Sequence, residues 1–124
     1  MQLSVNARET QGAVILELIG RVVAGEEVDS VRKMIHDLVD HDHKKVSLNL
    51  DQVGRIDSTG IGMLVEAVIY TVKQGGQLNL YKVPRLVRNI LTTHRLLQAF
   101  DVYGSEAEAL AGFEKAGPQP AIET

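Results

Sequence analysis

The sequence predicts a mixed α/β domain: an open, mixed β-sheet that begins with an N-terminal hairpin and carries about four helices mainly on one face. Two observations lead to this fold class. Short segments in which apolar and polar residues alternate recur along the chain, and segments with helical spacing of apolar residues stand between them. Because the strands alternate, each should bury one face, which favours helices gathered on one side of the sheet.

The N-terminal third of the chain predicts a hairpin and then a helix. Residues 3–8 alternate, Gln11-Gly12 interrupts the pattern, and an apolar run follows at 14–19, as expected for two strands joined by a turn. Residues 26–39 place aliphatic side chains at helical spacing and begin with acidic residues, which the helix dipole favours.

The middle of the chain predicts a strand, a helix and a strand. Residues 46–51 and 78–81 alternate, and Gly75-Gly76 ends the helix between them. The apolar residues of that helix follow the i, i+3, i+4, i+7, i+8, i+11 series. This series predicts a buried stripe consisting of Ile61, Leu64, Val65, Val68, Ile69 and Val72.

The C-terminal part predicts a third helix, a short strand and a fourth helix. Pro84 suits the first position of the third helix, residues 100–103 form the strand, and Ser105 followed by Glu108 is a capping pattern for the last helix. We expect a single domain over residues 1–116 and a flexible tail over 117–124.

Size and composition limit the class of protein. The 124 residues fit one domain, and 44% hydrophobic and 23% charged residues are typical of a globular core. A net charge of −3 argues against nucleic acid as a direct partner, and the absence of cysteine excludes disulfides and thiolate metal sites. No secretory signal or apolar span is recognisable, so we expect a cytoplasmic protein without membrane insertion.

The candidate functional site is the polar loop Asp57-Ser58-Thr59-Gly60, between a strand and a helix. A side-chain oxygen of Asp57 or Ser58 can accept from the unpaired N–H groups of the first helical turn, so one interpretation is a plain helix cap. The other is that the Ser58 hydroxyl is accessible to a kinase and that a phosphate there would disturb a docked partner. Gly60 and Gly62 lower helix propensity but would let another backbone approach closely.

An apolar strip is predicted on the outward side of the same helix. Opposite the predicted buried stripe the helical wheel places Met63, Ala67 and Tyr70, with Glu66 beside them. A partner that covered this strip would also cover Ser58, about one helical turn away. The alternative is that these are scattered surface residues of no special role.

At this loop the chain resembles the STAS family, whose bacterial anti-sigma-factor antagonists carry an Asp-Ser-Ser/Thr-Gly-Leu/Ile-Gly signature after a strand rich in Leu, Asn and Asp. The matching segments are 48–51 and 57–62, and the similarity extends over nearly all of residues 3–115. The resemblance implies phosphorylation of Ser58, with Asp57, Thr59, Gly60 and Gly62 as the supporting loop.

The resemblance also implies a partner switch. The unphosphorylated protein would bind an anti-sigma factor with serine kinase activity and free the sigma factor; phosphorylation would end that binding until a serine phosphatase restores it. No catalysis and no cofactor are implied for this chain. Other roles known in the family are a non-catalytic subunit of a lipid-transport or stressosome-type complex and a ligand-sensing module.

Two arginines depart from the family pattern. Arg21 stands where many members have an acidic, partner-facing segment, and Arg55 stands where an apolar residue is usual. If the first and third strands lie side by side, as they do in the family, both arginines would add positive charge near Ser58. They are either two exposed arginines or part of a partner surface or phosphate site.

Metal binding and catalysis are not expected. His36 and the segment 40–43 contain histidines and aspartates, but alternating residues point apart, and cations are favourable near a helix C-terminus on dipole grounds. Ser58 has neither a Gly-x-Ser-x-Gly elbow nor a recognisable base, and no Walker A loop is present.

Overall fold

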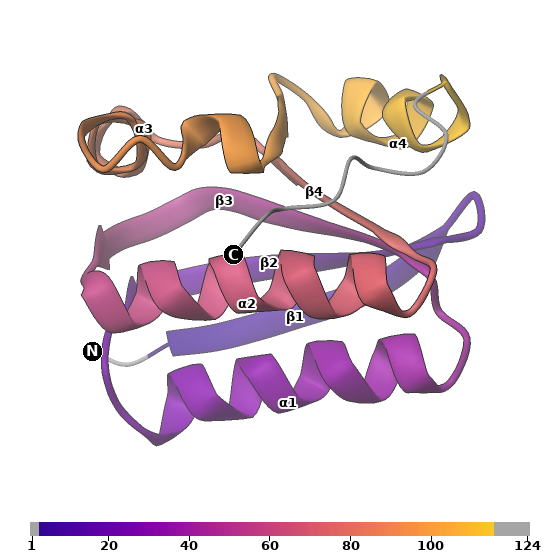
Figure 1. The fold of residues 1–124 in the computed structure, drawn as a ribbon, viewed down its shortest axis with the longest axis horizontal. Coiled ribbons are helices and arrows are strands. Elements are labelled where there is room, and N and C mark those ends of the chain that lie inside the picture. Colours follow the sequence, from indigo (N-terminus) through magenta and orange to yellow (C-terminus); the bar gives the residue numbers. More distant parts are fainter. Residues whose placement is uncertain (1–2, 116–124) are drawn as a thin grey trace.

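The computed structural model describes residues 3–115 and shows one five-stranded sheet covered by helices (Figure 1). The elements are β1 (Leu3–Thr10), β2 (Ala13–Val22), α1 (Glu26–Asp40), β3 (Lys45–Ile56), α2 (Ser58–Lys73), β4 (Gln77–Tyr81), α3 (Arg85–Thr93), the 3₁₀ helix η1 (Leu97–Ala99), β5 (Asp101–Tyr103) and α4 (Glu106–Lys115). The strand order is β1-β2-β3-β4-β5, with β1 antiparallel to β2 and the other pairs parallel. The predicted mixed α/β fold is confirmed, whereas the predicted tail lies outside the described residues.

The N-terminal hairpin is held by a two-residue turn. Gln11 and Gly12 both have positive φ, 51° and 79°, and Thr10 pairs directly with Ala13. Positive φ at both central positions is typical of a type I′ turn, whose twist matches that of the two strands. The strand pair expected from the interruption at Gln11-Gly12 is therefore confirmed.

The two faces of the sheet bury different residues of β2. Val14, Leu16 and Leu18 belong to the main core, to which α1, α2 and α3 also contribute, whereas Ala13 and Ile15 pack with residues of α4. Successive strand residues point to opposite faces, so three helices cover one face and α4 covers the other. Figure 1 shows α1 and α2 lying alongside each other across the sheet.

Beneath α4 the sheet buries polar groups that alternation alone would place in solvent. Ser47 and Asn79 are 0% and 3% exposed; the Ser47 hydroxyl donates to the Asn79 amide oxygen, and the Asn79 amide donates to the carbonyl of Ala109 at 3.0 Å. The Tyr81 hydroxyl donates to Glu106 at 3.0 Å, and burial followed by this bond raises the pKa of Tyr81 to about 12. Buried polar groups are thus paired, as stability requires.

Helix ends follow the expected chemistry with one correction. Gly75 has φ 84° just after α2, and Ser105 accepts from the N–H of Glu108 at 3.2 Å at the start of α4. Pro84 is not the first residue of α3: its ψ of 154° is extended, so it caps the helix, which begins at Arg85. Within residues 3–115 the longest helix has 16 residues, and none is long and apolar enough to cross a bilayer.

Candidate functional site

Asp57 joins two segments of chain at the start of α2. Its backbone is extended, and its Oδ1 accepts from the N–H of Gly60 at 2.9 Å, which makes it the N-cap. Its Oδ2 accepts from the N–H of Ala24, in the loop after β2, at 3.0 Å. Of the two residues considered as caps, Asp57 therefore fills the role, and Ser58 is left as the first residue of the helix.

The carboxylate of Asp57 is stabilised in its charged form. The N–H of Ala24, followed by that of Gly60, lowers the pKa of Asp57 below its ordinary value. Because the folded-state pKa is the lower one, the interaction contributes stability above the unfolded value of about 4, and this stability is lost as pH falls through the folded value.

We therefore expect Asp57→Asn to reduce the acid sensitivity of folding as well as the stability at neutral pH. The urea midpoint of the wild type should fall more steeply than that of the variant between neutral pH and about pH 3, because only the wild type protonates this cap. Asp51→Asn is the matched control, since the Asp51 carboxylate accepts from the side chain of Gln52. Parallel pH profiles for wild type and Asp57→Asn would contradict the assignment.

The hydroxyl of Ser58 is exposed at the start of α2. The residue is exposed, and its side chain makes no hydrogen bond to any residue that the structure describes. It stands at the helix N-terminus, where N–H groups and the dipole favour negative charge. The side chain can therefore gain a phosphate without losing an internal contact. Thr59, the next residue, is also exposed.

The two glycines of this turn have different surroundings. Gly60 is buried, and an added Cβ would lie 2.0 Å from the carbonyl oxygen of Val22. The close approach expected at Gly60 is thus made by the chain's own β2. Gly62 is exposed, and an added Cβ would meet nothing within 4 Å. Only Gly62 leaves room for a partner.

The buried stripe of α2 is rotated by one residue from the predicted one. Met63 and Ala67 are 1% and 0% exposed, so their prediction as outward, partner-binding residues is wrong. Of the predicted stripe, Ile61, Leu64 and Val68 are buried, and burial extends toward the preceding residues instead of the following ones. The buried residues of α2 are Gly60, Ile61, Met63, Leu64, Ala67, Val68 and Thr71. The reason is that α2 packs against α1 as well as the sheet and is apolar on almost every side, so periodicity alone does not fix its orientation.

Tyr70 links α2 to α1 instead of standing open to a partner. Its ring stacks on His36 with centroids 3.7 Å apart, and its hydroxyl donates to Asp40, which raises the pKa of Tyr70. His36 Nε2 also lies 2.9 Å from a carboxylate oxygen of Glu66. The predicted outward strip is therefore largely an interhelical contact.

A groove runs along the outer side of α2 from Ser58. Its volume is about 580 Å³, and α2 supplies one wall while the segment after α3 supplies the other. The lining residues are Ser58, Ile61, Gly62, Val65, Glu66, Ile69, His94 and Leu96. Val65 and Ile69 were predicted to be core, but both are partly exposed and lie on the same side as Ser58.

Comparison with known families agrees with the fold. The sequence model of the STAS domain matches residues 4–109. This chain belongs to the STAS domain family. No curated protein sequence matches it.

Solved structures with this STAS fold come from several bacteria. The Thermotoga maritima protein TM1081 is 21% identical with a TM-score of 0.82, covering 90% of this chain and 95% of that one. Phosphorylated SpoIIAA of Bacillus is 17% identical with a TM-score of 0.69, covering 87% and 97%. A sulfate transporter family protein from Wolinella succinogenes is 25% identical with a TM-score of 0.71, covering 85% and 87%.

The two unusual arginines of this STAS domain are cross-strand neighbours. Arg21 and Arg55 are paired residues of the parallel strands β2 and β3, and both are exposed. The prediction required the first and third strands to be neighbours, but β2 lies between β1 and β3; the two arginines are adjacent because Arg21 belongs to β2. Val22 and Ile56, the next residues, are buried in the main core, so the arginines face the opposite side of the sheet from α2.

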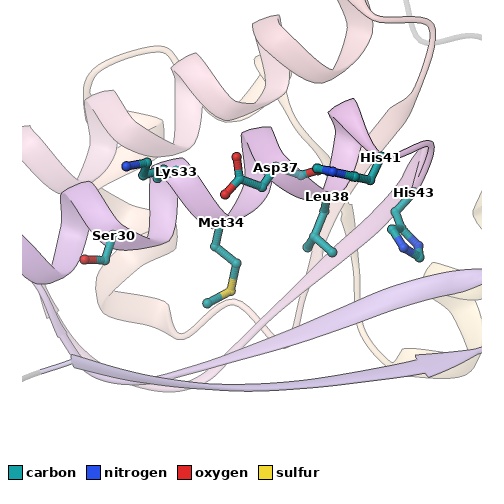
Figure 2. A pocket seen from close by; sticks show the side chains of 7 residues that line it. All are labelled: Ser30, Lys33, Met34, Asp37, Leu38, His41 and His43. Carbon is teal, nitrogen blue, oxygen red and sulfur yellow. The ribbon is translucent and has the colours of Figure 1, made fainter.

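A second groove of the STAS domain, about 650 Å³, lies along α1 and shares no residue with the first (Figure 2). Figure 2 shows Met34 and Leu38 pointing toward the strands, whereas Asp37 lies on the other side of the helix. His41 Nδ1 lies 2.7 Å from the carbonyl oxygen of Asp37 at the helix end. Within the described residues, no three His, Asp or Glu side chains are grouped to hold a metal ion.

Proposed function

We propose that this STAS domain is an anti-sigma-factor antagonist that acts as a phosphorylation-controlled partner switch in the cytoplasm. The unphosphorylated form binds an anti-sigma factor with serine kinase activity and so releases the sigma factor. Phosphorylation of Ser58 ends the binding, and a serine phosphatase restores it. The observation that carries this proposal is the exposed, unpaired hydroxyl of Ser58 at the rim of an apolar groove.

The chemistry of the switch belongs to the partner enzymes. The kinase transfers the terminal phosphoryl group of ATP to Ser58 Oγ, the hydroxyl loses its proton, and ADP leaves. This chain supplies the acceptor and needs no cofactor or catalytic base of its own. Asp57 contributes by capping α2, which leaves the neighbouring hydroxyl outward and unbonded.

Electrostatics explains why a phosphate would end binding without unfolding the domain. The phosphate adds roughly −1.5 to −2 charges, which the N-terminus of α2 tolerates. In a complex, the same charge would lie at the Ser58 end of the apolar groove, next to Ile61 and Gly62, with Glu66 adding negative charge to the groove. Burying an unpaired charge in an apolar interface is strongly unfavourable. SpoIIAA, an anti-sigma factor antagonist of the same fold, exists in phosphorylated and unphosphorylated forms.

We expect Ser58 to be the residue that the kinase modifies. Incubation with ATP and a candidate kinase-type anti-sigma factor, followed by peptide mass spectrometry, should find phosphate on Ser58 and none in Ser58→Ala, which retains Thr59. Ser58→Asp should weaken the complex at least tenfold, which calorimetry would measure as a loss of about 1.4 kcal/mol of binding free energy. Thr59→Asp, which places the same charge one residue away, is the control. Phosphate on Thr59 alone, or full binding by Ser58→Asp, would refute the switch.

The likeness to the Wolinella sulfate transporter family protein supports a second candidate, a non-catalytic subunit of a transport complex. In that role the groove on α2 would hold a permanent partner and Ser58 would serve only as a surface residue. An affinity for the partner that does not change when residue 58 carries a charge would favour this candidate.

A further inference from the structure

Glu66 is an acidic residue on the groove beside Ser58, and its carboxylate is held in place from α1. Its two oxygens lie 3.0 and 2.9 Å from His36 Nε2. An ionised carboxylate only accepts hydrogen bonds, so His36 Nε2 is the donor. The ring of His36 is itself stacked on Tyr70, with the two ring planes 5° apart. The carboxylate of Glu66 is therefore oriented at the edge of the groove that faces α1.

The oriented carboxylate of Glu66 has room for a cation. One shared N–H leaves most of its acceptor positions open, and its side chain is 42% exposed. Within residues 3–115 no lysine or arginine forms an ion pair with it. A positively charged side chain that enters the groove can reach these oxygens without displacing His36.

The rest of the groove fits an amphipathic helix. From Ser58 to Ile69 the groove follows α2 for about 16 Å, which is three helical turns. Val65 lies on this wall, and Leu96 lies on the opposite one. A partner helix of about three turns can lay an apolar stripe between the two walls, in the manner of helix-in-groove recognition. A residue beside that stripe, on the side of α1, then meets Glu66.

We propose that the segment of the partner in this groove is an amphipathic helix with a lysine or arginine beside its apolar stripe, which pairs with Glu66. The proposal rests on the proposed function for the protein that carries the helix. Charge complementarity selects this occupant, because an acidic or neutral helix would cover the Glu66 carboxylate without pairing it.

A cation at Glu66 would not offset a phosphate on Ser58. Glu66 lies more than two helical turns beyond Ser58 on α2, about 12 Å along the helix axis. This separation exceeds the Debye length of about 8 Å at physiological salt. The pairing at Glu66 is therefore compatible with release of the partner by phosphorylation.

The test uses the full chain and two synthetic peptides. Each is an alanine-rich helical peptide of about 14 residues, or four turns, with leucines at helical spacing. The residue beside the leucine stripe is lysine in one peptide and glutamine in the other. Binding is followed by NMR of the methyl groups of Val65 and Ile69. The lysine peptide should bind roughly threefold more tightly at low salt, because exposed ion pairs contribute modestly, and high salt should remove the difference.

Two variants of equal net charge show whether Glu66 is responsible for this preference. Glu66→Gln should abolish the preference for the lysine peptide, and its amide oxygen can still accept from His36, so the fold is retained. Glu114→Gln should keep the preference, because Glu114 is an exposed residue of α4, which covers the other face of the sheet. An equal loss in both variants would show a general attraction between the acidic protein and basic peptides, which would overturn the proposal.

Other results would also overturn the inference: equal affinities of the two peptides for the wild type, methyl shifts at Met34 and Leu38 of the groove along α1 instead, or no binding of either peptide. If one of these occurs while Ser58 is phosphorylated and Ser58→Asp releases the anti-sigma factor, the helix inference alone fails. If the kinase leaves Ser58 unmodified, the proposed switch fails and the peptide results stand.

Discussion

Gly60→Ala is expected to destabilise the folded state by about 3 kcal/mol or more, although alanine is the better helix former. The added methyl group would lie 2.0 Å from the carbonyl oxygen of Val22 and 2.9 Å from side-chain carbons of Val22 and Ile56. Backbone cannot move as cheaply as a flexible side chain, so α2 would have to separate from the end of β2. Urea unfolding should show a large fall in the midpoint with an unchanged slope.

Gly62→Ala is the matched control for this result. It makes the same chemical change two residues later in the same helix, where an added Cβ meets nothing within 4 Å. Helix propensity should then dominate, and the variant should gain up to about 1 kcal/mol. A loss at Gly62 equal to that at Gly60 would mean that the helix start is sensitive to any side chain, and the close approach to Val22 would not be the cause.

The order of helices and strands was predictable because short local sequence patterns determine each element. Alternation at residues 46–51, the interruption at Gln11-Gly12 and the capping pattern at Ser105 each act within a few residues of chain, and each has the expected structural counterpart. The loop at Ser58 was found for the same reason: a helix begins directly after a strand, and a cap must stand between them.

The features that were missed depend on contacts between distant segments. The orientation of α2 is set by α1 and by the approach of Gly60 to Val22, neither of which appears in the local pattern. The burial of Ser47 results from α4, which comes about 60 residues later in the chain, so alternation placed it in solvent. A clue was present in the small residues of α2, because glycine and alanine in a helix often mark close packing.

Neither the pairing of Arg21 with Arg55 nor the sheet face on which the pair lies was predictable from the sequence. A one-residue bulge moves the residues after it to the opposite face of the sheet. The sequence around Gly54 does not show whether Gly54 pairs with β2 or forms such a bulge. The departures from the family pattern drew attention to Arg21 and Arg55, and the structure was needed to place them on the sheet face opposite α2.

Met63→Ala should lower the free energy of unfolding by about 3 kcal/mol, because it removes a side chain that is 1% exposed and leaves a cavity in the main core. Any loss of partner binding by this variant would then follow from lost folding, which circular dichroism and urea unfolding would reveal. Ile69→Ala removes a side chain of similar size that is partly exposed on the groove beside Ser58.

Ile69→Ala should therefore cost less stability than Met63→Ala and yet weaken the partner complex directly, measured at a temperature where both variants remain folded. Hot spots of protein interfaces are apolar side chains that a partner fully desolvates, and Ile69 can be reached by a partner whereas Met63 cannot. Comparing the two variants tests whether the groove is the docking surface. If Met63→Ala stays folded but binds weakly, and Ile69→Ala binds fully, the docking surface lies away from the groove. The opposite result would make the groove along α2, with Ser58 at its rim, the surface on which phosphorylation acts.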